Sequence, residues 1–204
     1  MTNQPYPLKE APNDYPIADL IKKRWSPVIF SNQPIDQEKI NSLFEAMRWA
    51  PSSRNEQPWL VVYATQDQVE DFKRIADLLD EGNAYAKNAY LLLVVFGKRH
   101  HNYKNKPNVT YQYDTGAGAE NLFLQAVSMD LIAHEMGGYN REKSYEVLNV
   151  SQDSYESIAT IAVGYPGDPT QATAEQKTDD AKPRQRKSIS EFVFNGKVVD
   201  KSEI

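Results

Sequence analysis

The chain has 204 residues with 23 basic and 28 acidic side chains, giving a formal net charge of −5 at pH 7. Nucleic-acid-binding proteins normally carry a basic excess, so we predict no nucleic-acid partner. The absence of cysteine excludes disulfides, thiolate metal sites and a cysteine nucleophile. No apolar run approaches the roughly 20 residues that cross a bilayer, and residues 1–20 show no secretory signal. We therefore expect a cytoplasmic protein with no membrane partner.

The first part of the chain predicts an extended arm followed by two helices. Four prolines within residues 1–16 disfavour a helix and favour an extended arm. Apolar residues at helical spacing predict a helix that starts near Ile17 and ends at Pro27. A second helix is expected from Asp36, a candidate N-cap, up to Pro51.

The middle of the chain predicts two strands separated by a helix. β-Branched and aromatic residues predict a buried strand over residues 59–64, and Asp67 then offers an N-cap for a helix. Residues 90–96 are apolar on both faces, so this strand is expected in the middle of a sheet that is covered on both sides. Residues 97–113 are polar and rich in aromatics, which predicts a long irregular excursion of the kind found above ligand sites.

The C-terminal half predicts a core helix, a shorter helix, a strand and an arm. A wide apolar stripe predicts the core helix over residues 114–130. The shorter helix is expected over residues 139–149 and the strand over residues 157–163. Residues 164–188 are too polar to bury themselves, yet the apolar residues 189–194 that follow need a surface to dock on, which suggests another subunit. Since no regular βαβ rhythm appears, we expect one α+β domain with a mixed sheet between helical layers.

Several common catalytic motifs are incomplete or missing. Gly116 and Gly118 begin a GxG pattern, but Asn121 replaces the third glycine of a dinucleotide fingerprint. The pair His134-Glu135 lacks the second histidine of HExxH. The sequence contains neither a Walker phosphate loop nor a G-x-S-x-G elbow. We therefore predict no metal site and no side chain that acts as a nucleophile.

Two basic clusters lie near the two ends of this acidic chain. Residues 22–27 and residues 182–188 each combine lysine and arginine with a serine hydroxyl. Arginine presents a planar fork of donors that suits phosphate oxygens, and serine adds a neutral donor. Charge alone leaves two interpretations open: a site for an anionic partner, or solvated surface, which is the commoner case.

Four separated segments together carry a more specific pattern. They are Arg24-x-Ser26, the run Ala50-Pro51-Ser52-Ser53-x-Asn55-x-Gln57-Pro58-Trp59, Gly164-Tyr165-Pro166, and Arg184-x-Arg186. In this order they resemble the nitroreductase family of FMN-dependent oxidoreductases. The run over residues 50–59 is highly specific, and the similarity extends over residues 17–194. Residues 133–139 also resemble the flavin-edge loop of that family.

The resemblance implies a fold and an assembly. The expected fold is the α+β sandwich of the family, with a mixed central sheet flanked by helices, as a single domain over residues 1–204. The family forms intertwined homodimers with two FMN sites at the interface. Residues 1–16 would then be an extended N-terminal arm, and residues 164–204 a C-terminal arm that wraps around the partner. This agrees with the polar arm and apolar end that the composition already indicated.

The resemblance also implies which residues bind FMN. Arg24 and Ser26, joined by Arg184 and Arg186, would hold the phosphate or ribityl end. Pro51, Ser52, Ser53 and Asn55 of the other subunit would line the isoalloxazine. Gln57 would either contact the flavin or order the loop that carries these residues. The backbone N–H groups of two glycines would face flavin N5 and O4, and one asparagine would face the pyrimidine ring. The implied cofactor-binding residues are Arg24, Trp25, Ser26, Pro51, Ser52, Ser53, Asn55, Gln57, Asn83, Lys87, Met136, Gly137, Gly138, Arg184 and Arg186.

Purely structural roles remain open for some of these residues. Ser52 and Asn55 also suit a helix C-terminus and a turn, and Gly137-Gly138 also suits a tight turn before a helix. Many family members carry a basic residue where this chain has Val28. A cation there stabilises the negative charge that reduced FMN carries at N1. We expect Lys87 to supply that charge instead.

The resemblance implies a redox activity in which the flavin carries the chemistry. NADH or NADPH would deliver a hydride to flavin N5 and leave, and a nitroaromatic, quinone or similar planar acceptor would then take its place in a ping-pong cycle. No catalytic side chain is expected. Three tyrosines of the 97–113 excursion either stack on the acceptor or pack the rim: Tyr103, Tyr111 and Tyr113. Alternatives are another flavin reaction on the same fold, such as reductive dehalogenation or flavin cleavage, and a non-enzymatic redox sensor.

Overall fold

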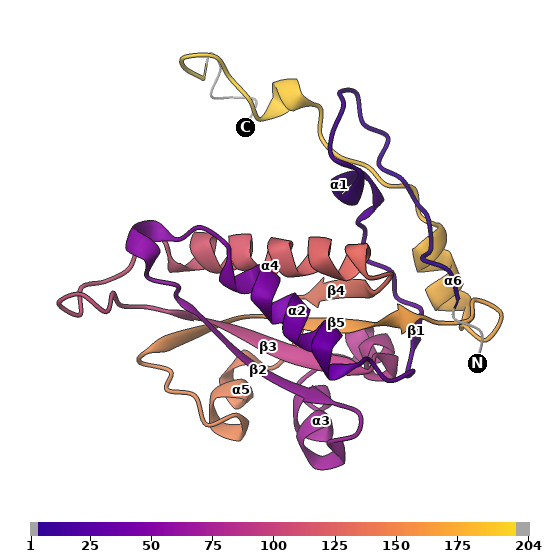
Figure 1. Ribbon diagram of the computed structural model, residues 1–204, viewed down its shortest axis with the longest axis horizontal. Helices are drawn as coiled ribbons and strands as arrows, with labels where there is room; N and C mark the ends of the chain where they lie inside the picture. Colours follow the sequence, from indigo (N-terminus) through magenta and orange to yellow (C-terminus); the bar gives the residue numbers. More distant parts are fainter. Residues whose placement is uncertain (1–3, 199–204) are drawn as a thin grey trace.

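A five-stranded antiparallel sheet forms the centre of the computed structural model, which describes residues 4–198 (Figure 1). The strands are β1 (Phe30–Ser31), β2 (Trp59–Thr65), β3 (Leu91–Lys98), β4 (Ile132–Met136) and β5 (Tyr155–Pro166). Their order is β1-β5-β3-β2, and β4 also pairs with β5. All four strand pairs in this part of the chain are antiparallel. The α+β class is confirmed, whereas the described sheet is not mixed as expected.

Strand β3 shows why the sheet is covered on both faces. Successive side chains of a strand point to opposite faces. Leu91, Leu93 and Val95 pack in one apolar cluster, together with residues of the helices α2 (Gln37–Arg48) and α4 (Tyr111–Ser128). The alternate residues of β3 join a second cluster on the other side. The continuous apolar run therefore predicted a central strand correctly.

The second cluster is covered by shorter helices. It contains Ile75 of α3 (Val69–Ala76) and Ala86 of the 3₁₀ helix η2 (Glu81–Asn88), and Tyr145 of α5 (Arg141–Val147) packs against it. Figure 1 shows α2 and α4 on one side of the sheet and α3 and α5 on the other. The predicted arrangement of a sheet between helical layers is thereby confirmed.

Two segments differ from the sequence-based expectation. Residues 132–136 form strand β4, although the sequence indicated a loop beginning at Ala133. The excursion after β3 is shorter and more ordered than expected, because a bridge between His100 and Pro107 closes it into a hairpin. Helix α4 then begins at Tyr111, three residues before its predicted start. Among residues 4–198 no helix combines the length and the apolar composition of a membrane span.

The two ends of the chain project together from one end of the sheet (Figure 1). The elements in these ends are α1 (Asp19–Lys23), α6 (Ala174–Ala181) and the 3₁₀ helix η3 (Ile189–Glu191). None of the three contains a buried residue. Arg184 joins the ends by donating hydrogen bonds to the carbonyl oxygens of Lys9 and Lys22, both at 2.8 Å. Residues 1–3 and 199–204 of the predicted arms lie outside the described residues.

Candidate functional site

The three predicted phosphate-binding arginines lie close together where the two chain ends meet. Arg24 directly follows α1, and Arg184 follows α6 in the returning C-terminal segment. Burial lowers the pKa of Arg184, and the positive charges of Arg24 and Arg186 lower it further. The lowering reflects the repulsion of Arg184 by the other two guanidinium groups in a partly desolvated place. An anion at this point would relieve the repulsion.

The arginine cluster, Arg24, Arg184 and Arg186, has donors that the described part of the chain does not satisfy. The Nε atom of Arg24 is buried without a hydrogen-bond partner there, and so is the hydroxyl of Tyr6. The nearest counter-charge of Arg24 is Glu120 on α4, at 3.4 Å between Nε and Oε1. Because buried donors normally find acceptors, these two groups are suited to a ligand that brings oxygen atoms.

Trp25 and Ser26 lie beside the arginine cluster but differ in how they are held. The indole N–H of Trp25 donates to the carbonyl oxygen of Pro7 at 2.6 Å. The ammonium group of Lys9 lies 4.0 Å from the centre of the Trp25 ring, in cation–π contact. Trp25 therefore anchors the N-terminal arm, while Ser26 stays exposed and free to contact a ligand.

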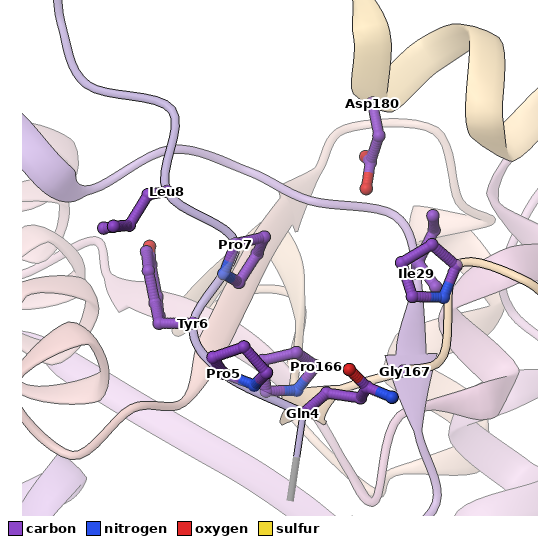
Figure 2. A pocket seen from close by; sticks show the side chains of 10 residues that line it. Gln4, Pro5, Tyr6, Pro7, Leu8, Ile29, Pro166, Gly167 and Asp180 are labelled. Carbon is purple, nitrogen blue, oxygen red and sulfur yellow. The ribbon is translucent and has the colours of Figure 1, made fainter.

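A cavity of about 300 Å³ lies between the N-terminal arm and the base of the C-terminal arm (Figure 2). Its walls are mainly apolar and include Leu8, Ile29 and Pro166. The carboxyl group of Asp180 also lines it and accepts a hydrogen bond from the N–H of Val28 at 2.9 Å. Because a carboxylate there would repel a phosphate, this cavity is not the predicted phosphate site.

The predicted isoalloxazine-binding loop, residues 51–58, lies between α2 and β2, away from the arginine cluster (Figure 1). It contains the short 3₁₀ helix η1 (Ser53–Asn55). Its residues Arg54, Asn55 and Gln57 have φ values of 54°, 55° and 48°, in the left-handed region that glycine favours. The single chain thus does not bring this loop to the arginines, and the sequence had assigned the loop to the other subunit's site.

Side-chain hydrogen bonds hold the 51–58 loop in this conformation. The Ser52 hydroxyl accepts the N–H of Gln57 at 3.0 Å. The N–H of Ser53 donates to the carboxylate of Asp114, on α4, also at 3.0 Å. The side-chain amide of Gln57 donates to the carbonyl oxygen of Asn55 at 3.2 Å. Gln57 thus contributes a hydrogen bond within the loop, its side chain is exposed, and Pro51 is exposed at the start of the loop.

The structure brings Asn83 and Gly138 into contact. The amide nitrogen Nδ2 of Asn83 donates to the carbonyl oxygen of Gly138 at 2.7 Å, and the N–H of Asp80 donates to the same oxygen at 3.1 Å. Gly137 is exposed at the end of β4, just before α5. The preceding residue, Met136, is 3% exposed and packs in the core. Its side chain therefore serves the fold.

Val28 and Lys87 are placed in different surroundings. Val28 is buried, and its carbonyl oxygen accepts a hydrogen bond at 3.2 Å from the side chain of Gln176 on α6. Lys87 is exposed in the last turn of η2. The pKa of Asp77 is lowered mainly by its hydrogen bond with Lys73 and to a smaller extent by the charge of Lys87. Lys87 thus presents its charge near Asp77.

The three tyrosines of the excursion divide into two groups. The Tyr111 hydroxyl donates to the carboxylate of Glu156, and burial raises the pKa of Tyr111 to about 12. Tyr103 and Tyr113 are 59% and 82% exposed. Tyr111 thus packs the rim, and only the other two are free to stack on a ligand.

Three residues near the arginine cluster or the 51–58 loop could not be identified as site residues from the sequence. Tyr6 lies in a proline-rich arm, and its burial comes from packing against the second apolar cluster, whose residues lie later in the chain. Asp114 begins the predicted core helix and so looks like an ordinary first-turn acid. Glu120 lies on the same helix and is one of the 28 acidic side chains of the sequence.

Comparison with known proteins identifies relatives of this chain. The model of the Nitroreductase family matches residues 21–95. A Mycolicibacterium smegmatis protein named "Uncharacterized 15.4 kDa protein in ask 5'region" is 32% identical over 131 residues, which is 63% of this chain and 84% of that protein. The "Putative NADH dehydrogenase/NAD(P)H nitroreductase" of Archaeoglobus fulgidus is 25% identical over 152 residues, which is 73% of this chain and 84% of that protein.

Solved structures extend the similarity over almost the whole chain. A crystal structure described as an "oxidoreductase containing FMN" is 33% identical, covers 98% of this chain and 100% of its own, and superposes with a TM-score of 0.87. A nitroreductase family protein of Clostridium difficile 630 is 20% identical, covers 88% and 97% of the two chains, and has a TM-score of 0.66. The second likeness concerns the fold alone.

Proposed function

Because the chain belongs to the nitroreductase family, we propose that it is an FMN-dependent oxidoreductase that takes electrons from NADH or NADPH. The observation that carries the proposal is the arginine cluster, in which the charges of Arg24 and Arg186 act on Arg184 and the buried Nε of Arg24 has no hydrogen-bond partner among the described residues. The 33% identity to an FMN-containing oxidoreductase over nearly the full length supports the choice of ligand.

The arginine cluster fits the phosphate end of FMN. Two planar guanidinium groups can each give paired hydrogen bonds to phosphate oxygens. Arg184 is already oriented, because its Nη1 donates hydrogen bonds to the backbone carbonyl oxygens of Lys9 and Lys22. Arg24 would exchange its 3.4 Å contact with Glu120 for the phosphate, and the exposed hydroxyl of Ser26 would add a neutral donor.

The ring end of the site requires a second copy of the chain in this proposal. The 51–58 loop of one protomer would line the isoalloxazine held by the arginines of the other, through Pro51, Ser52, Ser53 and Asn55. The N–H groups at Gly137 and Gly138 would face the reactive edge of the ring. Lys87 would supply the cation that Val28 does not provide. The proposed assembly is accordingly a homodimer.

When bound, FMN would supply two-electron exchange in two half-reactions, from NAD(P)H and then to a nitroaromatic, quinone or similar planar acceptor. The protein's own groups bind and orient in this scheme. The arginine cluster fixes the phosphate tail, and the backbone at residues 137–138 fixes the ring edge. The exposed rings of Tyr103 and Tyr113 offer flat apolar surface to a planar acceptor.

Titration of the purified protein with FMN tests the proposal. Arg24→Ala and Arg184→Ala should each weaken FMN binding by roughly tenfold or more, since a charged hydrogen bond to an anion is lost. The matched control is Arg74→Ala, which removes an exposed arginine of α3 that pairs with Asp71. The control should bind FMN like the unaltered protein.

A second measurement separates enzyme from sensor. The visible flavin absorption of the loaded protein should bleach with NADH or NADPH in the absence of oxygen and return when menadione or a nitroaromatic is added. A yellow protein that responds to neither nicotinamide would favour a redox sensor. A colourless protein that takes up no FMN would contradict both functions.

A further inference from the structure

The backbone of the 51–58 loop is unusual for a segment without glycine. Three of its residues, Arg54, Asn55 and Gln57, have positive φ values. A left-handed backbone is strained for residues with a side chain. Each of the three residues would therefore adopt more favourable φ and ψ angles if nothing held the loop in this conformation. Something outside these three residues must therefore hold the loop in place.

Asp114 provides that anchor from α4. It lies in the first turn of the helix and is only 4% exposed. Its Oδ2 atom accepts two hydrogen bonds at 3.0 Å, one from the N–H of Ser53 and one from the hydroxyl of Thr110. A carboxylate at a helix N-terminus ordinarily serves the N–H groups of its own helix. Here both donors lie outside the helix, and one belongs to the loop.

The bond to Ser53 is the more important of the two for Asp114. The Thr110 hydroxyl also lies 3.0 Å from Oδ1 of Asn108. A hydroxyl has one hydrogen and donates to one acceptor at a time. Whenever Thr110 donates to Asn108, the N–H of Ser53 is the remaining donor to a carboxylate that is almost fully buried. Loss of this bond would leave that carboxylate poorly satisfied.

A second carboxylate holds the loop at another point. Glu56 accepts a hydrogen bond at 2.8 Å from the N–H of Asn102, at the turn of the hairpin that His100 and Pro107 close. The pKa of Glu56 is lowered, chiefly by this bond. The loop is thus fixed at Ser53 to α4 and at Glu56 to the hairpin, and the left-handed residues Arg54 and Asn55 lie between the two anchors.

We propose that Asp114 is the positioning residue of the 51–58 loop: its carboxylate, through the N–H of Ser53, holds the strained backbone in place and thereby sets how tightly FMN is bound. The second part rests on the proposed function, in which Ser52, Ser53 and Asn55 line the flavin. Asp114 itself touches no ligand in this proposal. It acts through Ser53.

Limited trypsin digestion of the native protein tests the first part without FMN. Trypsin cleaves after arginine, and Arg54 is exposed at the centre of the loop. Asp114→Ala should accelerate cleavage after Arg54 roughly tenfold, because the open form of the loop becomes more populated. Asp114→Asn keeps an oxygen that can accept the Ser53 N–H, so it should restore slow cleavage.

Ser53 allows the same bond to be removed without altering α4. Ser53 is the first residue of η1, where proline is tolerated, and Ser52 has φ −145° and ψ 152°, which suits a residue before proline. Ser53→Pro removes the N–H and should also accelerate cleavage, whereas Ser53→Ala keeps the N–H and should not. This pair keeps the proposal testable if Asp114→Ala does not fold.

FMN titration of the same variants tests the second part. Asp114→Ala should raise the FMN dissociation constant roughly tenfold, with Asp114→Asn close to the unaltered protein. Urea unfolding of each variant shows whether a global loss of stability accounts for the change. Slow cleavage and unaltered FMN affinity in both Asp114→Ala and Ser53→Pro would overturn the proposal. Accelerated cleavage in a protein that never binds FMN would keep the anchor and refute the proposed function.

Discussion

At the scale of single residues, the two adjacent glycines 137 and 138 differ in the space around them. A Cβ atom at Gly138 would lie 2.8 Å from Nδ2 of Asn83 and 3.0 Å from Oδ2 of Asp80. At Gly137 the nearest atom would be Nη2 of Arg141, at an ordinary 3.8 Å. The sequence alone does not distinguish the two glycines, whereas the packing shows that only position 138 has no room for a side chain.

Gly138→Ala should therefore destabilise the protein by about 1–3 kcal/mol, the usual cost of overpacking. The added methyl group must displace the Asn83 amide that donates to the Gly138 carbonyl oxygen. Gly137→Ala is the matched control and should change stability by about 0.5 kcal/mol or less. Urea unfolding followed by circular dichroism measures both. Equal effects of the two substitutions would contradict this account.

At the scale of elements, strand β4 is fixed to the segment before β1 through His134. Its Nδ1 atom donates to the carbonyl oxygen of Pro27 at 3.1 Å, and its ring packs on Tyr85 with 5.2 Å between centroids. Burial lowers the pKa of His134 from 6.5, while the hydrogen bond to Pro27 and the charges of Asp180 and Asp179 act in the opposite direction. Burial thus favours the neutral form of His134 at its contact with Pro27.

The sign of the resulting pH dependence follows from linkage. In the unfolded chain His134 is protonated near pH 6.5, whereas in the folded chain it is protonated only at lower pH. The contribution of neutral His134 to the free energy of unfolding is therefore complete above pH 6.5. It is lost as the pH falls through the pKa of His134 in the folded state. His134→Asn should remove this loss while keeping a donor for Pro27. The raised pKa of Asp180 acts with the opposite sign and is present in both proteins, so it largely cancels in the difference.

Unfolding free energies of the unaltered protein and His134→Asn, compared between pH 7.5 and 5, measure the effect. The control is His100→Asn, which makes the same exchange at a histidine of the hairpin, away from the Pro27 contact. Parallel stability curves for the unaltered protein and His134→Asn would contradict the assignment.

At the scale of the whole molecule, the chain ends carry apolar side chains that the single chain does not bury. Four of them follow the arginine cluster and are 39–62% exposed: Ile189, Phe192, Val193 and Phe194. The helix α1 likewise has no buried residue. Elements of this kind lack the packing that normally stabilises short helices. A second copy of the chain would supply it, in line with the proposed homodimer.

Phe192→Ser combined with Phe194→Ser should convert a dimer into monomers, since burying each phenylalanine contributes about 1.5–3 kcal/mol. Sedimentation equilibrium measures the mass, and FMN titration should show weaker binding in the same variant. Val109→Ser changes an apolar side chain that is 89% exposed just before α4 and serves as the control. A variant that stays dimeric, or an unaltered protein that is already monomeric, would contradict the proposed assembly.

The sequence by itself determined the elements whose burial follows a local period. The apolar run at residues 90–96 predicted the central strand, because a strand covered on both faces needs apolar residues at every position. The helical spacing around Leu43 and Leu122 predicted the helices that cover the sheet. The order of the four short motifs indicated the family that the comparisons show.

Only the tertiary structure decided which distant groups meet. Strand β4 carries too little pattern of its own and is a strand because β5 offers it hydrogen bonds. Arg24 and Arg184 meet only because the two chain ends run side by side, and Asp114 reaches Ser53 only because α4 packs beside the loop. A local sequence pattern shows the period at which the apolar side chains of a segment are buried. It does not record which partner, a hundred residues away, completes a hydrogen bond or shares a charge.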